Sequence, residues 1–195
     1  MIHLGKAMGA LMFFLFFIVI VIAIILISNN IIRHHNATVR SWSDVASYER
    51  KKVRILDQLQ SLVEQYSKFE KETLEKVTEL RQSILNLRLN TTDASELQRI
   101  ETLNKELMHH LNVIVENYPE LKANEIYLKM MHQIEEQNEN VAAAIIIFNR
   151  NIELFNNHIQ IFPNNIVNTL ITSKKPIRPF RDNTTTQNFN YRPNF

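Results

Sequence analysis

The side chains of this sequence that could bind a metal or transfer a proton include seven histidines and twenty carboxylates, and one pair has the spacing of metal ligands. Glu106 and His109 form a Glu-x-x-His motif, which helical di-metal proteins use twice, together with two further carboxylates. This sequence contains the motif once. The pair flanks Leu107, which belongs to the apolar face of a predicted helix. We therefore expect Glu106 and His109 in solvent and predict no metal site.

Other patterns of catalytic side chains are absent from the sequence. It has no cysteine, which excludes disulfides, thiolate metal sites and a cysteine nucleophile. Two glycines are too few for the Gly-rich turns that hold phosphates or dinucleotides, and neither HExxH nor GxSxG occurs. A net charge of +2 gives no reason to expect a nucleic-acid partner. We predict no catalytic residue, no cofactor and no nucleic-acid partner, and a protein that is not an enzyme.

The N-terminal part of the chain is long, uncharged and apolar. Residues 7–32 carry no charge, and the part from Leu11 to Ile27 reads LMFFLFFIVIVIAIILI. About 20 apolar residues at ~1.5 Å each cross the ~30 Å hydrocarbon core of a bilayer. The apolar part is longer than that of a signal peptide, and no small-residue cleavage site follows it. We therefore predict a retained transmembrane helix over residues 7–28. The residues taken to mark this span are Ala7, Leu11, Phe14, Phe17, Ile20, Ile24 and Ile27.

A regular apolar pattern predicts a long helix after the span. Large apolar residues recur every three or four positions from Val39 to Leu87, and no glycine or proline interrupts residues 36–89. The pattern predicts one helix of about 50 residues with an apolar face along its whole length.

Two charge-rich stretches of this predicted helix, residues 48–54 and 69–79, alternate in sign. Alternating charge at helical spacing is typical of a solvated face with ion pairs four residues apart. Glu72 and Lys76 form such a pair, and we expect both to be exposed.

A second helix is predicted after a polar break at residues 90–93. Asp93 and Glu96 have the spacing of a capping box, which places the start of the helix there. The helix is expected to end near Asn117, because Pro119 restricts the residue before it and lacks a backbone donor.

A third helical pattern runs from Tyr127 to Phe162, with apolar residues spaced four and three apart. Pro119 suits its first turn, and Pro163 ends it. Asn138 is the polar residue on the apolar face. A buried Asn can set the register of packed helices, and the polar stretch around it can equally mark a kink that splits the helix. The core residues predicted for the first and third helices are Leu56, Leu59, Val63, Ile145, Phe148 and Ile152.

These patterns predict an all-α protein, in which one N-terminal transmembrane helix precedes an antiparallel, up-and-down helical bundle with long helices. Apolar faces must be buried against one another, and short connections make consecutive helices antiparallel neighbours. The domain boundaries are an N-terminal tail at 1–6, a transmembrane helix at 7–28, a helical bundle at 29–171 and a tail at 172–195. The tail is polar and contains three prolines, so we predict that it is disordered. Its basic residues, which anionic lipid could attract, are Lys174, Lys175, Arg178 and Arg181.

Three tracts of the sequence resemble the LemA family of bacterial membrane proteins. The first, WSDVASYERKKVRILDQLQSLVEQYSKFEKETLEKVTELR, covers residues 42–81. The second, YPELKANEIYL, covers 118–128, and the third, FNRNIELFNNHIQIFPNNIV, covers 148–167. Their order and rough spacing agree with the family, and so does the N-terminal span. The sequence departs from the family after Pro163, because the aromatic-glycine-aromatic stretch usual there is missing.

The resemblance implies a four-helix type of bundle behind one membrane helix, and it implies no reaction. The recurring polar residues of the three tracts have no assigned chemistry, and we interpret most of them as contacts that specify the bundle. These residues are Arg50, Asn124, Glu125, Asn149 and Asn156.

The function expected from these features is a non-catalytic, membrane-anchored scaffold or adaptor in the bacterial cell envelope. Its partners would be the lipid bilayer and other membrane or envelope proteins. Two alternatives stay open: a metal-binding or enzymatic bundle that uses inward polar residues, and a self-assembling coiled coil, a homo-oligomer, that shapes the membrane. The location would be the bacterial inner membrane, crossed once. The flanking charges Lys6, Arg33 and Arg40 favour only slightly a cytoplasmic position for the rest of the chain.

Overall fold

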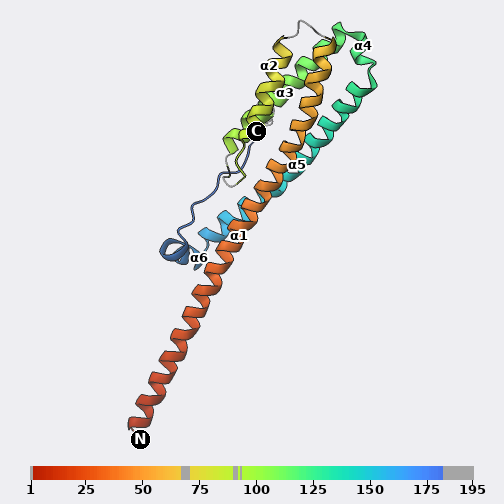
Figure 1. Ribbon diagram of the computed structural model, residues 1–195. Coiled ribbons are helices and arrows are strands. Elements are labelled where there is room, and N and C mark those ends of the chain that lie inside the picture. Colours follow the sequence, from red (N-terminus) through yellow and green to blue (C-terminus); the bar gives the residue numbers. More distant parts are fainter. Residues whose placement is uncertain (1, 67–70, 90–91, 93, 182–195) are drawn as a thin grey trace, which may run out of the picture. The chain divides into compact units, whose positions relative to one another are not determined.

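The computed structural model describes residues 2–66, 71–89, 92 and 94–181, and within them the chain is all-α without a β-strand (Figure 1). The prediction of an all-α protein with a long apolar N-terminal helix is confirmed. The up-and-down four-helix arrangement stays a prediction. The helices are α1 (Ile2–Tyr66), α2 (Lys71–Asn86), α3 (Ala94–Asn117), α4 (Pro119–Lys122), α5 (Glu125–Gln160), α6 (Asn164–Val167) and the π-helix η1 (Asn168–Thr172).

The chain divides into two compact units. Unit 1 comprises residues 1–38 and 151–177, and unit 2 comprises residues 39–150 and 178–195. Helices α1 and α5 therefore contribute residues to both units.

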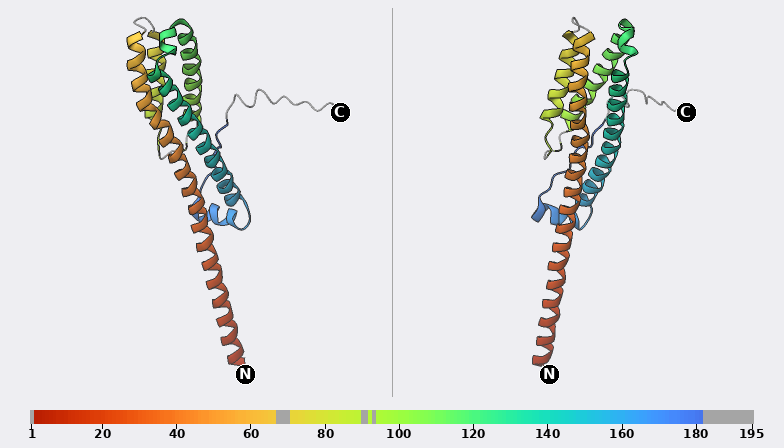
Figure 2. Two further views of the ribbon diagram at one scale, coloured as in Figure 1. Left: turned by 90° about the vertical axis from the view of Figure 1, so that its right-hand side faces the viewer. Right: turned by 45° about the vertical axis from the view of Figure 1, so that its right-hand side comes forward.

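Unit 1 contains the apolar part of α1, and its core lies at the end of that part. Ile31 of α1 is buried with Phe155 and Ile159 of α5 and with Val167 of α6. Two further contacts join α1 and α5 here. The Thr38 hydroxyl donates to the carbonyl oxygen of Asn151 at 3.1 Å, and the ring of His35 lies 5.4 Å from that of Phe155. Figure 2 shows α6 beside α1 at this level.

Unit 2 is built from residues 39–66 of α1 together with α2, α3, α4 and most of α5. Helices α2 and α3 run side by side (Figure 1). Trp42 of α1 is fully buried: its ring lies 5.2 Å from that of Phe148 on α5, and its Nε1 donates to the carbonyl oxygen of Arg88 at 2.7 Å. The fully buried apolar side chains of this core include Val45, Leu56, Leu59, Leu80, Ile84, Leu97, Ile100, Leu111 and Val141.

The single helix predicted over residues 36–89 is wrong, because the structure divides it. Helix α1 ends at Tyr66 and α2 begins at Lys71, while residues 67–70 lie outside the described part of the chain. The second half of the predicted apolar face packs against α3, with Val77, Leu80 and Ile84 buried. Two helices can bury this face on neighbours, whereas one straight helix would leave much of it in water.

The boundaries that rest on prolines agree with the structure in part. Helix α3 ends at Asn117 and Pro119 is the first residue of a helix, as predicted, but this helix, α4, ends at Lys122, and the third predicted helix begins only at Glu125 of α5. The capping box predicted at Asp93 involves a residue outside the described part of the chain; α3 begins at Ala94, the next residue.

Helix α5 is continuous over its 36 residues, so Asn138 does not split it. Its buried face differs slightly from the predicted one. Phe148 and Ile152 are buried as predicted, but Ile145 is half-buried and the neighbouring Ala144 is buried instead. The error arises because spacings of three and four fit the pattern equally well at these positions.

The predicted disorder of the tail does not hold for residues 172–181. After η1 these residues continue as an extended segment, and the Phe180 side chain is 8% exposed. Composition predicted disorder because the segment lacks helical periodicity, yet side-chain hydrogen bonds from elsewhere in the chain hold its backbone, as described below. Residues 182–195 lie outside the described part of the chain.

Candidate functional site

The most unusual polar group of unit 2 is a buried ion pair on α1. Glu49 and Lys52 are one helical turn apart, and their side chains are 0% and 1% exposed. The Lys52 Nζ atom lies 2.9 Å from Oε2 of Glu49. The same Nζ donates a hydrogen bond of 3.0 Å to Oδ1 of Asn138 on α5. The polar residue noticed on the apolar face of α5 therefore has a specific partner across the core.

Sequence reasoning missed this pair, because both residues lie in the charge-rich stretch predicted to be solvated. A signal was present in the spacing. Val45, Glu49, Lys52 and Leu56 are separated by four, three and four residues, which is the spacing of one buried helix face. The prediction instead assigned the neighbouring Tyr48 and Val53 to the core, because it followed apolar residues alone.

Burial raises the pKa of Glu49, and Glu101 raises it further, whereas the charge and hydrogen bond of Lys52 oppose the shift. The Oε1 atom of Glu49 has no hydrogen-bond partner among the described residues. A carboxylate in this setting holds its proton more tightly than one in water. A buried pair joined to a half-buried amide on another helix is well suited to specify how two helices pack.

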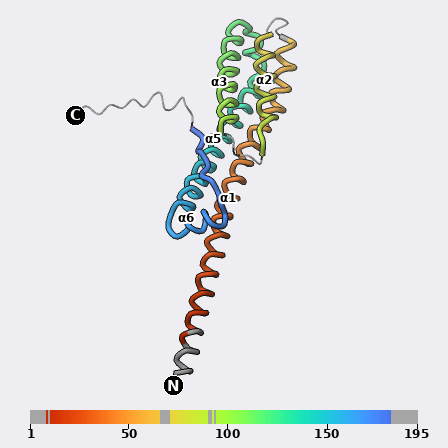
Figure 3. The backbone as a smooth tube through the Cα atoms, turned by 90° about the vertical axis from the view of Figure 1, so that its left-hand side faces the viewer, coloured from red at the N-terminus to blue at the C-terminus, as the bar shows by residue number. Residues whose placement is uncertain are grey.

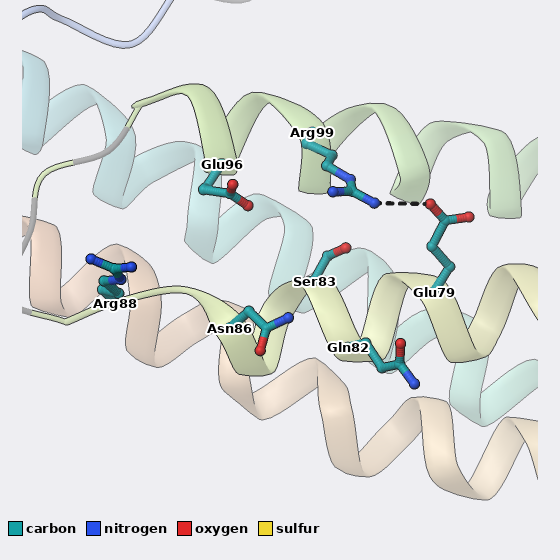
Figure 4. Close-up of a pocket in the computed structure, with 7 residues that line it drawn as sticks. All are labelled: Glu79, Gln82, Ser83, Asn86, Arg88, Glu96 and Arg99. Atoms are coloured by element: carbon teal, nitrogen blue, oxygen red, sulfur yellow. Dashed lines mark hydrogen bonds and ion pairs between the residues drawn. The ribbon is translucent and has the colours of Figure 1, made fainter.

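A polar cleft of about 340 Å³ lies between α2 and α3. Figure 4 shows its seven lining residues, which are Glu79, Gln82, Ser83, Asn86, Arg88, Glu96 and Arg99. Arg99 Nη2 and Glu79 Oε1 are 3.2 Å apart, and both side chains are more than half exposed. Two arginines and two glutamates balance each other, and exposed ion pairs contribute only about 0–1 kcal/mol. The cleft offers polar contacts to a partner, and Glu49 and Lys52 do not line it.

Three asparagines hold the extended C-terminal segment, each by a pair of hydrogen bonds to one residue. In unit 2, Asn149 Nδ2 donates to the carbonyl oxygen of Phe180, and its Oδ1 accepts from the Phe180 amide, both at 2.9 Å. In unit 1, Asn156 makes the same two bonds with Ile177, at 2.8 and 2.9 Å.

The third asparagine of this kind, Asn168 of η1, makes both bonds with Lys174, at 3.0 and 2.9 Å. The residues held, 174, 177 and 180, are three apart, which is the repeat of a polyproline II helix. Pro176 and Pro179 lie between them and favour that conformation. We call these three contacts the asparagine clasps. In each clasp the asparagine side chain binds the backbone amide and carbonyl groups of one residue, as a neighbouring strand does in a sheet.

Other polar residues of the three sequence tracts also have structural partners. Asn124 caps α5, because its Oδ1 accepts from the amides of Ile126 and Tyr127 at 2.9 and 3.1 Å. Arg50 Nη2 donates to the carbonyl oxygen of Leu87 at 3.1 Å, which joins α1 to the residue after α2. Glu125 is the exposed first residue of α5.

The predicted motif residues do not assemble a metal site within the described part of the chain. Glu106 is 54% exposed, with its Oε2 atom 4.0 Å from Nζ of Lys76, and His109 is exposed. No group of three or more His, Asp or Glu side chains that could hold a metal occurs in that part.

The residues predicted to mark the span differ in exposure, and those predicted to contact lipid are divided between the two units. Those from Leu11 to Ile20 are exposed, whereas Ile24 and Ile27 pack partly against the core of unit 1. Of the basic residues, Lys174 and Lys175 belong to unit 1, and Arg178 and Arg181 belong to unit 2. Helix α1 is long and apolar enough to cross a membrane, and its most apolar window has a mean hydropathy of 3.4.

Comparison with known proteins places the chain in a family. The model of the LemA family matches residues 41–190, which include the buried ion pair, the cleft and the clasps. The chain belongs to the LemA family. It is also similar to the protein LemA of Metamycoplasma hominis, with 31% identity over 105 residues. This match covers 53% of the chain and 46% of the relative, so the chain spans about half the length of that LemA protein.

Proposed function

We propose that this LemA-family chain is a single-pass membrane protein of the bacterial envelope whose helical part serves as a non-catalytic scaffold for other proteins. One observation carries the membrane assignment. None of the residues in the most apolar window of α1 is buried, and Phe13, Phe16 and Val19 are 63–73% exposed. Apolar surface costs roughly 25 cal/mol per Å² in water, and a bilayer removes that cost.

The scaffold assignment is supported by the kind of polar groups that the described helices carry. The buried Glu49 and Lys52 bind each other, and Lys52 also binds the half-buried Asn138 across the core. The asparagine clasps and the Asn124 cap of α5 are hydrogen bonds to backbone groups of the chain itself. These contacts stabilise a rigid helical surface, which is what a scaffold presents to partners.

Photo-crosslinking in the native membrane tests the scaffold role. A photoreactive amino acid at Gln82 samples the cleft, and one at Ile146, which is 70% exposed, samples α5. The same group at the buried Leu59 is the matched control. We expect reproducible adducts with other membrane or envelope proteins from an exposed position and none from Leu59. Adducts of the chain only with itself would favour the self-assembling alternative, and no adduct at any exposed position would overturn the scaffold proposal.

The metal-binding or enzymatic alternative has its own test. Metal analysis of the purified protein, before and after Glu106→Ala and His109→Ala, is expected to give no metal in stoichiometric amount and no difference between variants. Bound metal that is lost in either variant would contradict the non-catalytic proposal.

A further inference from the structure

Unit 1 exposes a second group of large apolar side chains, separate from the span. They occur in the turn formed by the end of α5, α6 and η1, between residues 161 and 171. Phe162 and Leu170 are 78% and 76% exposed, which is more than most apolar residues of the span. The full set is Ile161, Phe162, Ile166, Leu170 and Ile171. Ile166 and Leu170 are four apart along α6 and η1, so the helical path brings them to one side, and Phe162 lies in the turn just before α6. Contiguous exposed apolar surface of this kind marks an interaction site.

The position of this turn along α1 indicates what covers it. Val167 of α6 is buried against Ile31, and Ile24 and Ile27 pack on the same cluster. The predicted span, residues 7–28, is long enough to cross a ~30 Å hydrocarbon core and ends at Ser28, close to Ile24 and Ile27. The turn thus lies beside the last turns of the span, at the depth where hydrocarbon gives way to headgroups. Figure 3 shows α6 against α1 at this level.

The charge of unit 1 suits the same surface. Residues 1–38 and 151–177 contain four Lys or Arg (Lys6, Arg33, Lys174 and Lys175) and one acid, Glu153. Lys174 and Lys175 follow the turn directly, and the Lys174 backbone is clasped by Asn168 of η1. Burial lowers the pKa of His35, which follows the span on α1, and the charge of Lys174 lowers it further. Basic residues close to the membrane surface attract anionic headgroups.

We propose that the α5–α6–η1 turn is a second membrane contact, which inserts Phe162, Leu170 and Ile171 into the boundary between headgroups and acyl chains. Lys174 and Lys175 bind anionic headgroups next to them. The inference rests on the proposed membrane anchor. As a consequence, the last residues of the span contact both lipid and the α5–α6–η1 turn.

Depth measurements with single-cysteine variants of the full chain in vesicles test this contact. The sequence has no cysteine, so each variant carries a fluorophore at one position. Phe162→Cys and Leu170→Cys report on the turn. Phe16→Cys reports on the span, and Ile146→Cys, an exposed apolar position of unit 2, is the matched control. The vesicles contain phosphatidylcholine and phosphatidylglycerol, with nitroxide lipids that quench either near the headgroup or at mid-chain.

We expect the mid-chain nitroxide to quench position 16, the headgroup nitroxide to quench positions 162 and 170, and neither to quench position 146. If position 16 is quenched while positions 162 and 170 are no more quenched than position 146, the proposal of a second membrane contact is wrong, and the proposal of a membrane anchor is supported. If position 16 is not quenched, the anchor itself fails. Protection of 162 and 170 from iodide in water without quenching by lipid would mean that protein, rather than lipid, covers the turn, and would also overturn the proposal.

The role of the lysines is tested in the same system. Lys174→Gln with Lys175→Gln should weaken headgroup quenching at position 162 in vesicles that contain phosphatidylglycerol, and leave it unchanged in pure phosphatidylcholine. Equal quenching with and without the two substitutions in the anionic vesicles would show that the two lysines take no part in the contact.

Discussion

At the scale of single residues, the pair formed by Glu49 and Lys52 is the feature of the core that apolar patterning could not predict. Removing two charges from water is costly, and their attraction repays the cost only with good geometry and further hydrogen bonds. Here Lys52 has both Glu49 and Asn138 within 3.0 Å, while Oε1 of Glu49 has no partner in the described residues. We therefore expect the pair to define the packing of α1 and α5 more than to stabilise it.

A comparison of single and double substitutions tests this interpretation. Lys52→Met and Glu49→Leu each leave one buried charge without its partner and should each lower the free energy of unfolding by about 3–5 kcal/mol. The double variant should be close to neutral, or more stable than the parent by up to about 4 kcal/mol. Denaturant melts in mild detergent can follow the single tryptophan, Trp42, which is buried in unit 2. A double variant as unstable as the sum of the singles would mean that the pair itself stabilises the fold.

The raised pKa of Glu49 predicts a pH dependence of stability. In the folded state Glu49 releases its proton at a higher pH than in the unfolded state, so between the two pKa values the folded protein binds more protons. The contribution of Glu49 is therefore largest below its ordinary pKa and is lost as the pH rises through the raised one. Glu49→Gln should remove this fall from the melts, whereas Glu72→Gln, at a side chain that is 67% exposed, should keep it. Parallel pH profiles for the parent and Glu49→Gln would contradict the assignment.

At the scale of elements, the sequence predicted what proline and apolar spacing control. The end of α3 at Asn117, the start of a helix at Pro119 and most of the apolar face of α5 follow from these signals, whereas the separation of α4 from α5 was not predicted and the continuity of α5 at Asn138 was left open. The break between Tyr66 and Lys71 carries no glycine or proline, so its position depends on which neighbours bury the apolar face. The clasped segment was missed for a related reason. Two of its three clasps come from asparagines that are 21 and 31 residues away, and a local pattern cannot report such partners.

The asparagine clasps predict a specific effect on amide hydrogen exchange. Asn156→Ala removes both bonds to Ile177, and Asn149→Ala removes both bonds to Phe180. Each hydrogen bond contributes about 0.5–1.5 kcal/mol net, so each variant should weaken the hold on the segment by about 1–3 kcal/mol. The Ile177 amide should lose protection in the first variant and the Phe180 amide in the second. Asn157→Ala, at an exposed position of the same helix, is the matched control and should change neither. Unchanged protection in both variants would show that the clasps do not hold the segment.

At the scale of the whole molecule, the most apolar window of α1 has no buried residue, and the described polar contacts of the other helices bind largely their own side chains and backbone. The LemA match extends over residues 41–190 and leaves the span outside it, so the membrane assignment depends on the physical character of α1. Fourteen large apolar residues between Leu11 and Leu26 stay exposed in the fold and need lipid around them. The scaffold role, the second membrane contact and the orientation of the chain all depend on that one assignment.

The most direct test of the account is alkaline carbonate extraction of membranes from cells that make the full chain, followed by intact mass measurement. Carbonate strips peripheral proteins, and a spanning helix of this length resists it. We predict that the protein stays in the membrane pellet and that its mass includes residues 7–28. Release into the supernatant, or a mature chain that begins after residue 27, would contradict the membrane anchor and with it the central claim.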